Sequence, residues 1–391
     1  CARTNPRNER LTARRPEEPP ARPRHPAPGT RHPASRVPEV IKYLGSKRAL
    51  VGVLGTLAEA SGARTTVDLF TGTTRVAQEF KRRGLYVTAV DLASYSEILA
   101  RCYIGTDAAA VDLVELDALL AELDALPGVR GYITDTFCEQ ARFFQPHNGQ
   151  RIDAIRARLA GLVDHALYPV LLTALIEAAD RVDSTTGQHM AYLKSWSKRS
   201  FNELRLRRPV LLDGPGEARR GAAQQVVTQL PPTDLMYLDP PYNQHRYFAY
   251  YHIWETLVRW DAPDHYGIAR KRVDARAEQN QSPFNSRRTM AAAMADLIGN
   301  ARASVLLVSY NDEAWVTPEA MIGWLREAGH QRVELLAFDS RRYIGAQIGI
   351  YNPQGERVGR VTHTRNTEYV FVAGEADRVE AAVRAAGPFI V

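Results

Sequence analysis

Apolar residues along the chain alternate between short runs typical of buried strands and longer stretches with helical periodicity. The runs at 66–70 and 86–90 predict two strands, and a helix is predicted between them at 73–83, closed by Gly84. A loop and a helix precede them at 44–60. Later strands are predicted at 234–238, 304–310, 332–338 and 367–372, and later helices at 248–260, 290–300 and 318–329. Strands that alternate with helices predict an α/β fold built on a parallel sheet.

Residues 106–225 interrupt this alternation with a mostly helical pattern. Asp68, within the predicted strand at 66–70, and Asp239, directly after the predicted strand at 234–238, are 171 residues apart. Three strand–helix units need only about 90 residues at roughly 30 residues each, so close to half of this span is inserted. We therefore expect a catalytic domain formed by 39–105 and 226–391, with an inserted helical region at 106–225.

Residues 1–38 form an arginine- and proline-rich tail. They hold nine arginines, nine prolines, no lysine and three acids. Such a segment cannot bury enough apolar surface to offset the entropy of ordering, so we predict that it is disordered. The tail also accounts for the whole net charge of +6, because residues 39–391 carry 41 basic and 41 acidic groups. We expect the tail, which starts at Cys1 rather than Met, to be a fragment end or an artefact without a role in the chemistry.

The remaining composition is that of an ordinary globular protein. No apolar run approaches the roughly 18 residues that a membrane span needs, and the N-terminus lacks the apolar core of a signal peptide. The three cysteines, Cys1, Cys102 and Cys138, fit neither a disulfide framework nor a metal-ligand spacing. We therefore expect a cytoplasmic protein without a membrane partner or a metal.

The strongest chemical motif is Asp239-Pro-Pro-Tyr242, directly after a predicted apolar strand. In an open parallel sheet, ligands bind beyond the carboxyl ends of the strands. A carboxylate and a carbonyl held in place by Pro240 and Pro241 can both accept protons of an exocyclic amine, which frees its lone pair for reaction. The Tyr242 ring offers a face for stacking on an extruded base. The alternative is a Pro-Pro turn after a strand, in which Asp239 only caps a helix or a turn.

Three further segments are weaker signals for a nucleotide-like cofactor. Asp68-Leu-Phe-Thr-Gly-Thr73 stands at a strand-to-helix turn, where Gly72 permits close backbone approach and the helix N-terminus favours an anion. With one glycine, the turn is not a dinucleotide cradle. Asp91 follows the second strand, where an acid commonly holds ribose hydroxyls or caps the next helix. Lys42-Tyr-Leu-Gly-Ser-Lys47 could close over a small molecule or be an ordinary helix entry.

In this order the four segments resemble the Dam-like family of adenine-specific DNA methyltransferases, and 243–252, 307–311, 343–345 and 368–372 are also similar to it. The resemblance implies a Rossmann-like sheet that binds S-adenosylmethionine, with an inserted target-recognition domain and double-stranded DNA as substrate. It assigns Asp239, Pro240, Pro241 and Tyr242 to the adenine and catalysis. It assigns Tyr43, Lys47, Asp68, Phe70, Gly72 and Asp91 to the cofactor. A companion restriction endonuclease is a further partner that it raises.

Target recognition is the least specific part of the resemblance. Within the insertion only Tyr192-Leu-Lys194 and Phe201-Asn202 are similar to the family. Residues 194–208 carry six basic groups, among them Lys198 and Arg199, and only one acid, Glu203. We expect Tyr192, Lys194, Lys198, Arg199 and Asn202 to contact DNA. The alternative is a basic surface that balances the acidic run at 106–135.

Other functions remain open from the sequence alone. Methylation of the N4 amine of cytosine, or of adenine in RNA, would use the same acceptor groups. An oxidoreductase is disfavoured because the glycine cradle is absent. A DNA-binding module without catalysis is disfavoured because it would have no use for Asp239.

Overall fold

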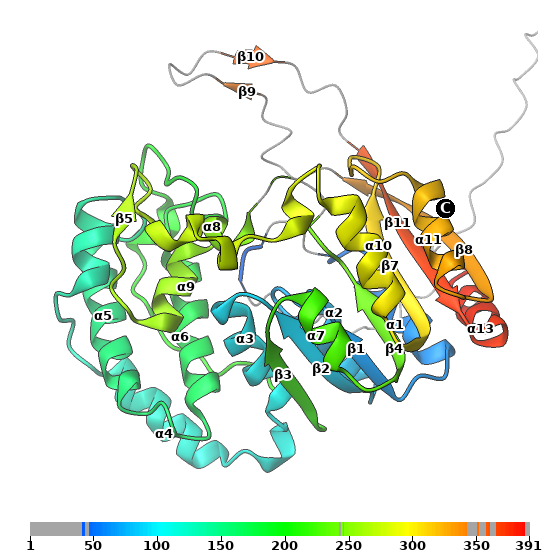
Figure 1. Cartoon of the computed structure of the whole chain (residues 1–391). Helices are drawn as coiled ribbons and strands as arrows, with labels where there is room; N and C mark the ends of the chain where they lie inside the picture. The colour runs from blue at the N-terminus through cyan, green and yellow to red at the C-terminus, as the bar shows by residue number, and fades with distance from the viewer. Residues whose placement is uncertain are drawn as a thin grey trace, which may run out of the picture. The chain divides into compact units, whose positions relative to one another are not determined.

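The computed structural model describes residues 41–43, 47–241, 244, 246–341, 350–351, 357–359 and 365–387. The predicted tail at 1–38 and the 343–345 segment lie outside these residues. The described chain contains a seven-stranded sheet in the order β3-β2-β1-β4-β7-β11-β8 (Figure 1). The strands are β1 (Thr65–Asp68), β2 (Tyr86–Asp91), β3 (Gly216–Arg220), β4 (Thr233–Leu238), β7 (Ala303–Asn311), β8 (Arg332–Arg341) and β11 (Arg365–Gly374).

The sheet is parallel from β3 to β7, and β11 runs antiparallel to both of its neighbours. Asp68 at the end of β1 is level with Tyr237 of β4, so the carboxyl ends of these central strands share one edge. Because β11 runs in the opposite direction, its first residues lie at that same edge, and Glu368 is level with Asn311 at the end of β7.

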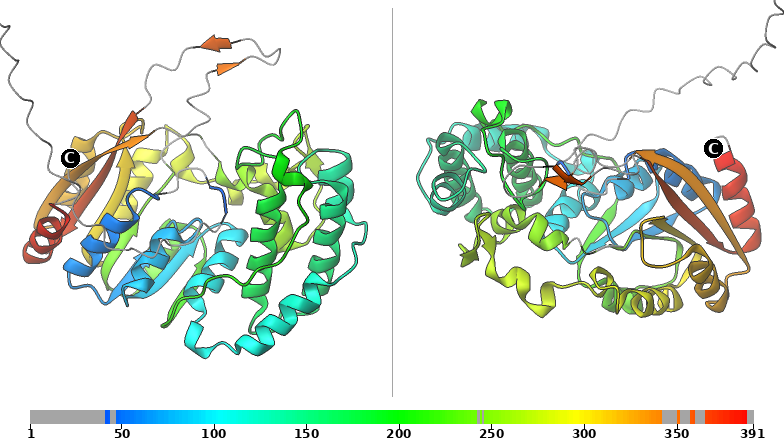
Figure 2. Two further views of the ribbon diagram at one scale, coloured as in Figure 1. Left: turned by 180° about the vertical axis from the view of Figure 1, so that it is seen from behind. Right: turned by 90° about the horizontal axis from the view of Figure 1, so that it is seen from above.

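Helices cover both faces of the sheet because its strands are apolar on both sides. Leu235 and Tyr237 belong to one core cluster, whereas Met236 and Leu238 belong to the other. The first face carries α1 (Val51–Ala60), α2 (Arg75–Arg82), α3 (Ser94–Ala100) and α13 (Ala376–Ala386). The second face carries α7 (Ala223–Gln229), α10 (Met290–Asn300) and α11 (Pro318–Glu327), as Figure 2 shows from two sides. This two-layered covering explains why the strands read as continuous apolar runs.

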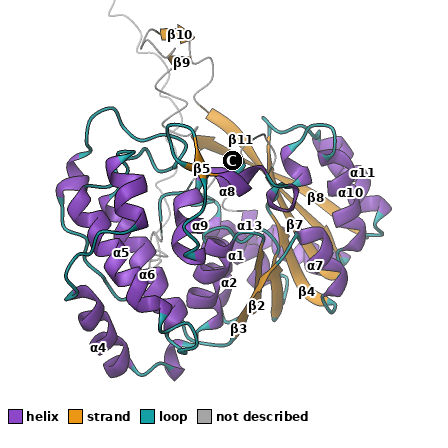
Figure 3. Cartoon of the chain, turned by 60° about the vertical axis from the view of Figure 1, so that its left-hand side comes forward, coloured by secondary structure: helices purple, strands orange, loops and turns teal. Residues whose placement is uncertain are grey.

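A group of helices lies to one side of the sheet (Figure 3). It comprises α4 (Leu113–Asp124), α5 (Pro146–Ala160) and α6 (Tyr168–Val182), and α8 (Tyr247–Tyr250) and α9 (His252–Arg259) follow the catalytic motif. Helix α6 is buried on nearly all sides and packs against α5, α3 and α9. Two short ribbons are also present, β5 (His265–Tyr266) with β6 (Lys271–Arg272) and β9 (Ile350–Tyr351) with β10 (Arg357–Gly359), besides several short 3-10 and π helices.

The predicted α/β fold with a parallel sheet is therefore confirmed, and the predicted strands and helices occur close to their expected positions. One edge strand went unpredicted. Strand β3, inside the range that we assigned to the insertion, pairs with β2. The sequence of β3, Gly-Glu-Ala-Arg-Arg, is polar, as is typical of a strand at a sheet edge. No apolar run therefore predicted this strand.

Candidate active site

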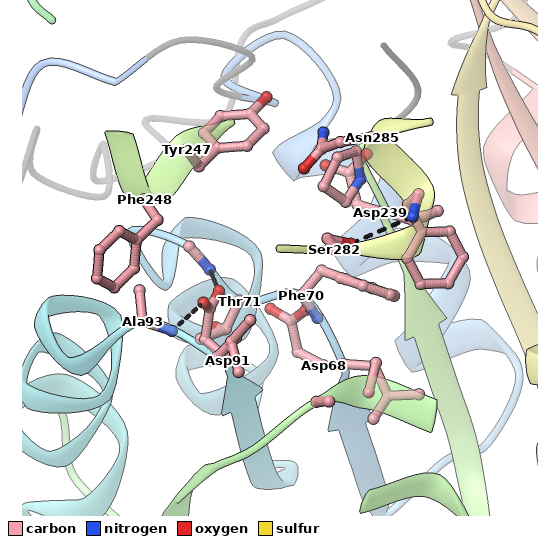
Figure 4. A pocket seen from close by; sticks show the side chains of 18 of the residues that line it. Asp68, Phe70, Thr71, Asp91, Ala93, Asp239, Tyr247, Phe248, Ser282 and Asn285 are labelled. Carbon is pink, nitrogen blue, oxygen red and sulfur yellow. Dashed lines mark hydrogen bonds between the residues drawn. The ribbon is translucent and has the colours of Figure 1, made fainter. Parts of the chain in front are cut away.

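A pocket opens at the carboxyl edge of the sheet, and it brings together most of the residues that the motifs singled out. Asp68 at the end of β1, Asp91 at the end of β2 and Asp239 directly after β4 all line it (Figure 4). Tyr43, Lys47, Phe70, Gly72, Pro240 and Pro241 line it as well. Tyr242 lies outside the described residues. Residues up to 198 positions apart in the sequence thus share one cavity, because parallel strands end at the same edge.

Asp68 is a buried carboxylate with little compensation for its charge. Burial, with repulsion from Asp239, raises the pKa of Asp68 to about 7, although the hydrogen bond from the Phe70 N–H lowers it. The Asp68 side chain is 1% exposed. Desolvation disfavours the ionised form of Asp68, and a nearby positive charge favours it. A cationic ligand bound in the pocket would therefore be attracted to Asp68 and would keep it ionised.

Asp91 uses both carboxylate oxygens to hold the walls of the pocket. One oxygen accepts a hydrogen bond from the Gly72 N–H at 2.9 Å, and the other accepts one from the Ala93 N–H at 3.0 Å. The second contact reaches the residue before α3, but Asp91 does not cap this helix, because the N–H groups of Ser94 and Tyr95 in its first turn donate to Glu255. Since a carboxylate offers about four acceptor positions, Asp91 retains capacity for a ligand hydroxyl. Burial raises the pKa of Asp91.

Tyr43 forms an aromatic wall next to Gly72. Its ring stacks on Tyr247 and Tyr251, with centroids 5.4 and 4.6 Å apart. Its hydroxyl lies 3.3 Å from that of Tyr95. Gly72 has φ of +50°, and a Cβ there would lie 3.2 Å from the Tyr43 ring. Glycine is therefore required at this turn for both conformation and space.

Lys47 contacts the proposed catalytic carboxylate itself. Its ammonium lies 3.2 Å from Asp239 Oδ1 and 3.1 Å from Glu368 Oε2. We predicted a cofactor contact for Lys47, and the structure adds this pairing, which no short-range motif reveals. Burial raises the pKa of Asp239 to about 6, Lys47 lowers it and Glu368 raises it.

Two further segments line the pocket and were missed by the sequence analysis. Residues 221–224 follow β3, and the Gly221 N–H donates to the Asp91 carbonyl at 2.9 Å. Residues 280–285 form the opposite wall, where Phe284 packs edge-on against Phe70 with centroids 5.3 Å apart. The first segment depends on the polar strand β3, and the second has no regular periodicity, so neither offered a signal.

The five residues expected at DNA occupy different environments in the structure. Lys194, Lys198 and Asn202 are exposed, whereas Tyr192 is half-buried against Phe143. The Arg199 guanidinium pairs with Asp183, which is 1% exposed. This pairing favours a structural role for Arg199.

The basic and acidic runs also pair with each other. Arg205 contacts Asp124 at 3.3 Å, and Arg208 contacts Asp117 at 3.3 Å. The alternative, in which the basic run at 194–208 neutralises the acidic run at 106–135, therefore accounts for part of the basic run. It leaves Lys194, Lys198 and Arg207, for which the described residues show no ion pair.

The fold and the pocket define a class. A seven-stranded sheet with one antiparallel strand next to its edge, and acids after β1, β2 and β4, is the Rossmann-like architecture of S-adenosylmethionine-dependent methyltransferases. Residues 43–309 match the family of D12 class N6 adenine-specific DNA methyltransferases, and the chain belongs to this family. It is a site-specific DNA methyltransferase that acts on the N6 amine of adenine. Of the functions that the sequence alone left open, the family therefore supports adenine methylation in DNA.

Curated relatives agree with this family. The chain is 28% identical to the type II methyltransferase M.NlaIII of Neisseria lactamica, over 78% of this chain and 92% of the relative. It is also 28% identical to the modification methylase StsI of Streptococcus sanguinis, over 73% of this chain but only 46% of that longer relative.

Solved structures resemble the chain only distantly. A precorrin-6y C5,15-methyltransferase from Geobacter metallireducens covers 85% of this chain and 93% of its own, with a TM-score of 0.29 and 9% identity. A putative RNA methyltransferase from Pyrococcus horikoshii has a TM-score of 0.29 and 10% identity, and the match covers 86% of this chain and 90% of its own. We therefore take the fold from the strand order alone. Within the described residues, no helix is long and apolar enough to cross a membrane.

Proposed function

We propose that the pocket at the carboxyl edge binds S-adenosylmethionine and an extruded adenine side by side, and that it transfers the methyl group directly between them. The observation that carries this proposal is the convergence of Asp68, Asp91 and Asp239 in one cavity. Buried carboxylates without enough positive partners suit a cationic ligand. S-adenosylmethionine carries a sulfonium and an ammonium, so its chemistry fits this donor set.

On this proposal, Asp68 balances the cofactor's positive charge, and Asp91 accepts from its ribose. Tyr43, Phe70 and Gly72 shape the surrounding walls. When bound, the cofactor supplies an electrophilic methyl group. That no metal takes part stays a prediction.

The remaining chemistry belongs to the adenine amine. Asp239 and the Pro240 carbonyl accept its two protons as hydrogen bonds, which moves the nitrogen toward a tetrahedral geometry and exposes its lone pair. Tyr242 stacks on the base, and this stacking offsets the few kcal/mol that base flipping costs.

Target recognition is assigned to the helical region at 106–225, with DNA held against the turn around 198–202. The Phe201 side chain is 62% exposed there. Asn148, which is fully buried, fixes the turn, since its amide donates to the Asn202 carbonyl at 2.9 Å and accepts from the Leu204 N–H at 2.8 Å. A rigidly held exposed aromatic residue is suited to wedge between bases.

The names of the relatives raise two further proposals. Because M.NlaIII is a type II methyltransferase and StsI is a modification methylase, we propose that this enzyme protects a recognition sequence from a companion restriction endonuclease. We also propose that it works in the cytoplasm, where that DNA lies.

The function is tested by expressing the chain in cells that lack adenine methylation and reading their DNA by methylation-sensitive long-read sequencing. We expect N6-methyladenine within one short sequence. Purified protein should transfer tritiated methyl groups to double-stranded DNA that contains this sequence, but not to RNA. Label on cytosine, on RNA or at unrelated adenines would contradict the proposal.

The DNA surface leads to a prediction about salt dependence. Each phosphate contact adds about 0.9 to the slope of log K against log salt. Replacing Lys194 and Lys198 with alanine should therefore reduce this slope by close to two units in fluorescence anisotropy titrations. Affinity for S-adenosylmethionine should stay unchanged.

The matched control removes the same charge from Arg205 and Arg208, which are already paired with acids. This variant should change the slope much less than the lysine pair. A second control deletes residues 1–38. If the deletion flattens the slope and the lysine pair does not, the tail holds the DNA and the surface assignment is wrong.

A further inference from the structure

A buried lysine, Lys47, pairs with two carboxylates, of which Asp239 lines the pocket. The Lys47 side chain is 6% exposed, Asp239 is 18% exposed and Glu368 is 16% exposed. The two contacts of the Lys47 ammonium measure 3.2 and 3.1 Å. The three residues come from the segment before α1, the end of β4 and the start of β11. Only the tertiary structure brings them together.

The antiparallel strand β11 explains how Glu368 reaches this place. Every parallel strand of the sheet presents its last residues at the pocket edge, whereas β11 presents its first residues there. Glu368 stands near the start of β11, level with Asn311 on one side and Phe338 on the other. A carboxylate at this register lies at the catalytic edge without belonging to the catalytic motif.

The electrostatic effect on Asp239 has a definite direction. Four groups face its carboxylate: Lys47, Glu368, Asp68 and the Tyr237 hydroxyl. After burial, which dominates, Lys47 lowers the pKa of Asp239 and Glu368 raises it. An acceptor for the amine protons must be ionised, because a protonated carboxyl presents a donor in place of one acceptor. Lys47 therefore favours the active form, and Glu368 opposes it while holding Lys47.

We propose that Glu368 is a positioning residue for methyl transfer, which acts through Lys47 to orient the Asp239 carboxylate and to set its charge. Lys47 contacts Asp239 Oδ1, and the proposal gives the second carboxylate oxygen to the adenine amine. Because the Lys47 ammonium also contacts Glu368, the second ion pair restrains the ammonium and through it the orientation of Asp239. The inference rests on the proposed role of Asp239 as the amine acceptor.

The test is the pH dependence of single-turnover methylation with saturating S-adenosylmethionine and DNA. The rate of the unaltered enzyme should fall as the pH drops through about 6, where Asp239 becomes protonated. Glu368→Gln removes the group that raises the pKa of Asp239, so its acid limb should move to lower pH. Lys47→Met removes the group that lowers it, so its limb should move to higher pH. At pH 6.5 we expect the single-turnover rate of Lys47→Met to be at least about tenfold below that of the unaltered enzyme, since a shift of one pKa unit changes the ionised fraction up to tenfold. This difference in rate should become smaller by pH 9.

Two controls separate this role from damage to the fold. Glu334→Gln removes a carboxylate from β8 that pairs with Arg332 at the surface, and its pH profile should be unchanged. Lys47→Arg keeps the positive charge and should keep its acid limb close to that of the unaltered enzyme, even if Lys47→Met folds poorly.

Opposite shifts in Glu368→Gln and Lys47→Met support the proposal. The proposal is overturned if the acid limbs of the two pH–rate profiles do not move, or if both move in the same direction. If Lys47→Met instead loses affinity for S-adenosylmethionine in calorimetry while its limb stays in place, Lys47 is a cofactor contact and the proposal fails. Failure of the proposed function itself would be distinct, because the unaltered enzyme would then methylate no adenine.

Discussion

Replacing Asp239 with alanine should reduce the single-turnover rate of adenine methylation by at least about 10³-fold. On the proposed mechanism, the Asp239 carboxylate accepts a hydrogen bond from the N6 amine as positive charge develops there, and removing one preorganised partner of a developing charge typically costs 10²–10³-fold. Loss of Asp239 also removes one of the two carboxylates that pair with the Lys47 ammonium, while the pair with Glu368 remains. Tritiated methyl transfer to a DNA duplex of the recognition sequence measures the rate.

Asp239→Asn separates this chemical loss from unfolding. Because its pKa in the folded protein is raised to about 6, Asp239 contributes stability below pH 4 that is lost as the pH rises through 6. The asparagine variant has no such loss, so at pH 8 it should unfold at a temperature no lower than that of the unaltered enzyme. A variant that melts normally and keeps a tenth of the rate would show that Asp239 is not the acceptor.

Replacing Asp183 with alanine should lower the free energy of unfolding by about 3 kcal/mol, the low end for breaking a buried ion pair. Asp183 is 1% exposed and pairs with Arg199 and, at 3.2 Å, with Lys42. Lys42 also contacts Asp180 at 2.9 Å, so the network joins the segment before Tyr43 to the end of α6 and to the turn at 198–202. Without Asp183, the half-buried guanidinium of Arg199 loses its carboxylate partner.

Urea unfolding followed by circular dichroism measures this change. The matched control is Asp117→Ala, which breaks the surface pair with Arg208 and should cost less than about 1 kcal/mol. Because Arg199 fixes the turn that displays Phe201, Asp183→Ala should also weaken DNA binding at temperatures where it remains folded. Equal effects of the two substitutions on stability would show that the Asp183 network is not a structural anchor.

The sequence by itself determined the central sheet and the acids at its edge. Strands β1, β2, β4, β7 and β11 have enough apolar residues in short runs to be recognised locally, because both faces of a covered parallel sheet are buried. Asp68, Asp91 and Asp239 stand at or directly after the carboxyl ends of such strands, so the rule that parallel strands end at one edge predicted their convergence. The motif order was sufficient to identify the family.

The tertiary structure decided what depends on contacts between distant segments. Strand β3 is polar because it lies at an edge, so only its pairing with β2 reveals it. The sequence predicts Arg199 as a DNA contact in a basic run, and only the structure shows that its guanidinium pairs with the buried Asp183. Glu368 and Lys47 are 321 residues apart, and the reversed direction of β11 brings them together on Asp239. Local patterns record which residues are apolar or charged, whereas the partner of a buried charge is set by the packing of the whole chain, since an ionised group leaves water only where another group compensates it.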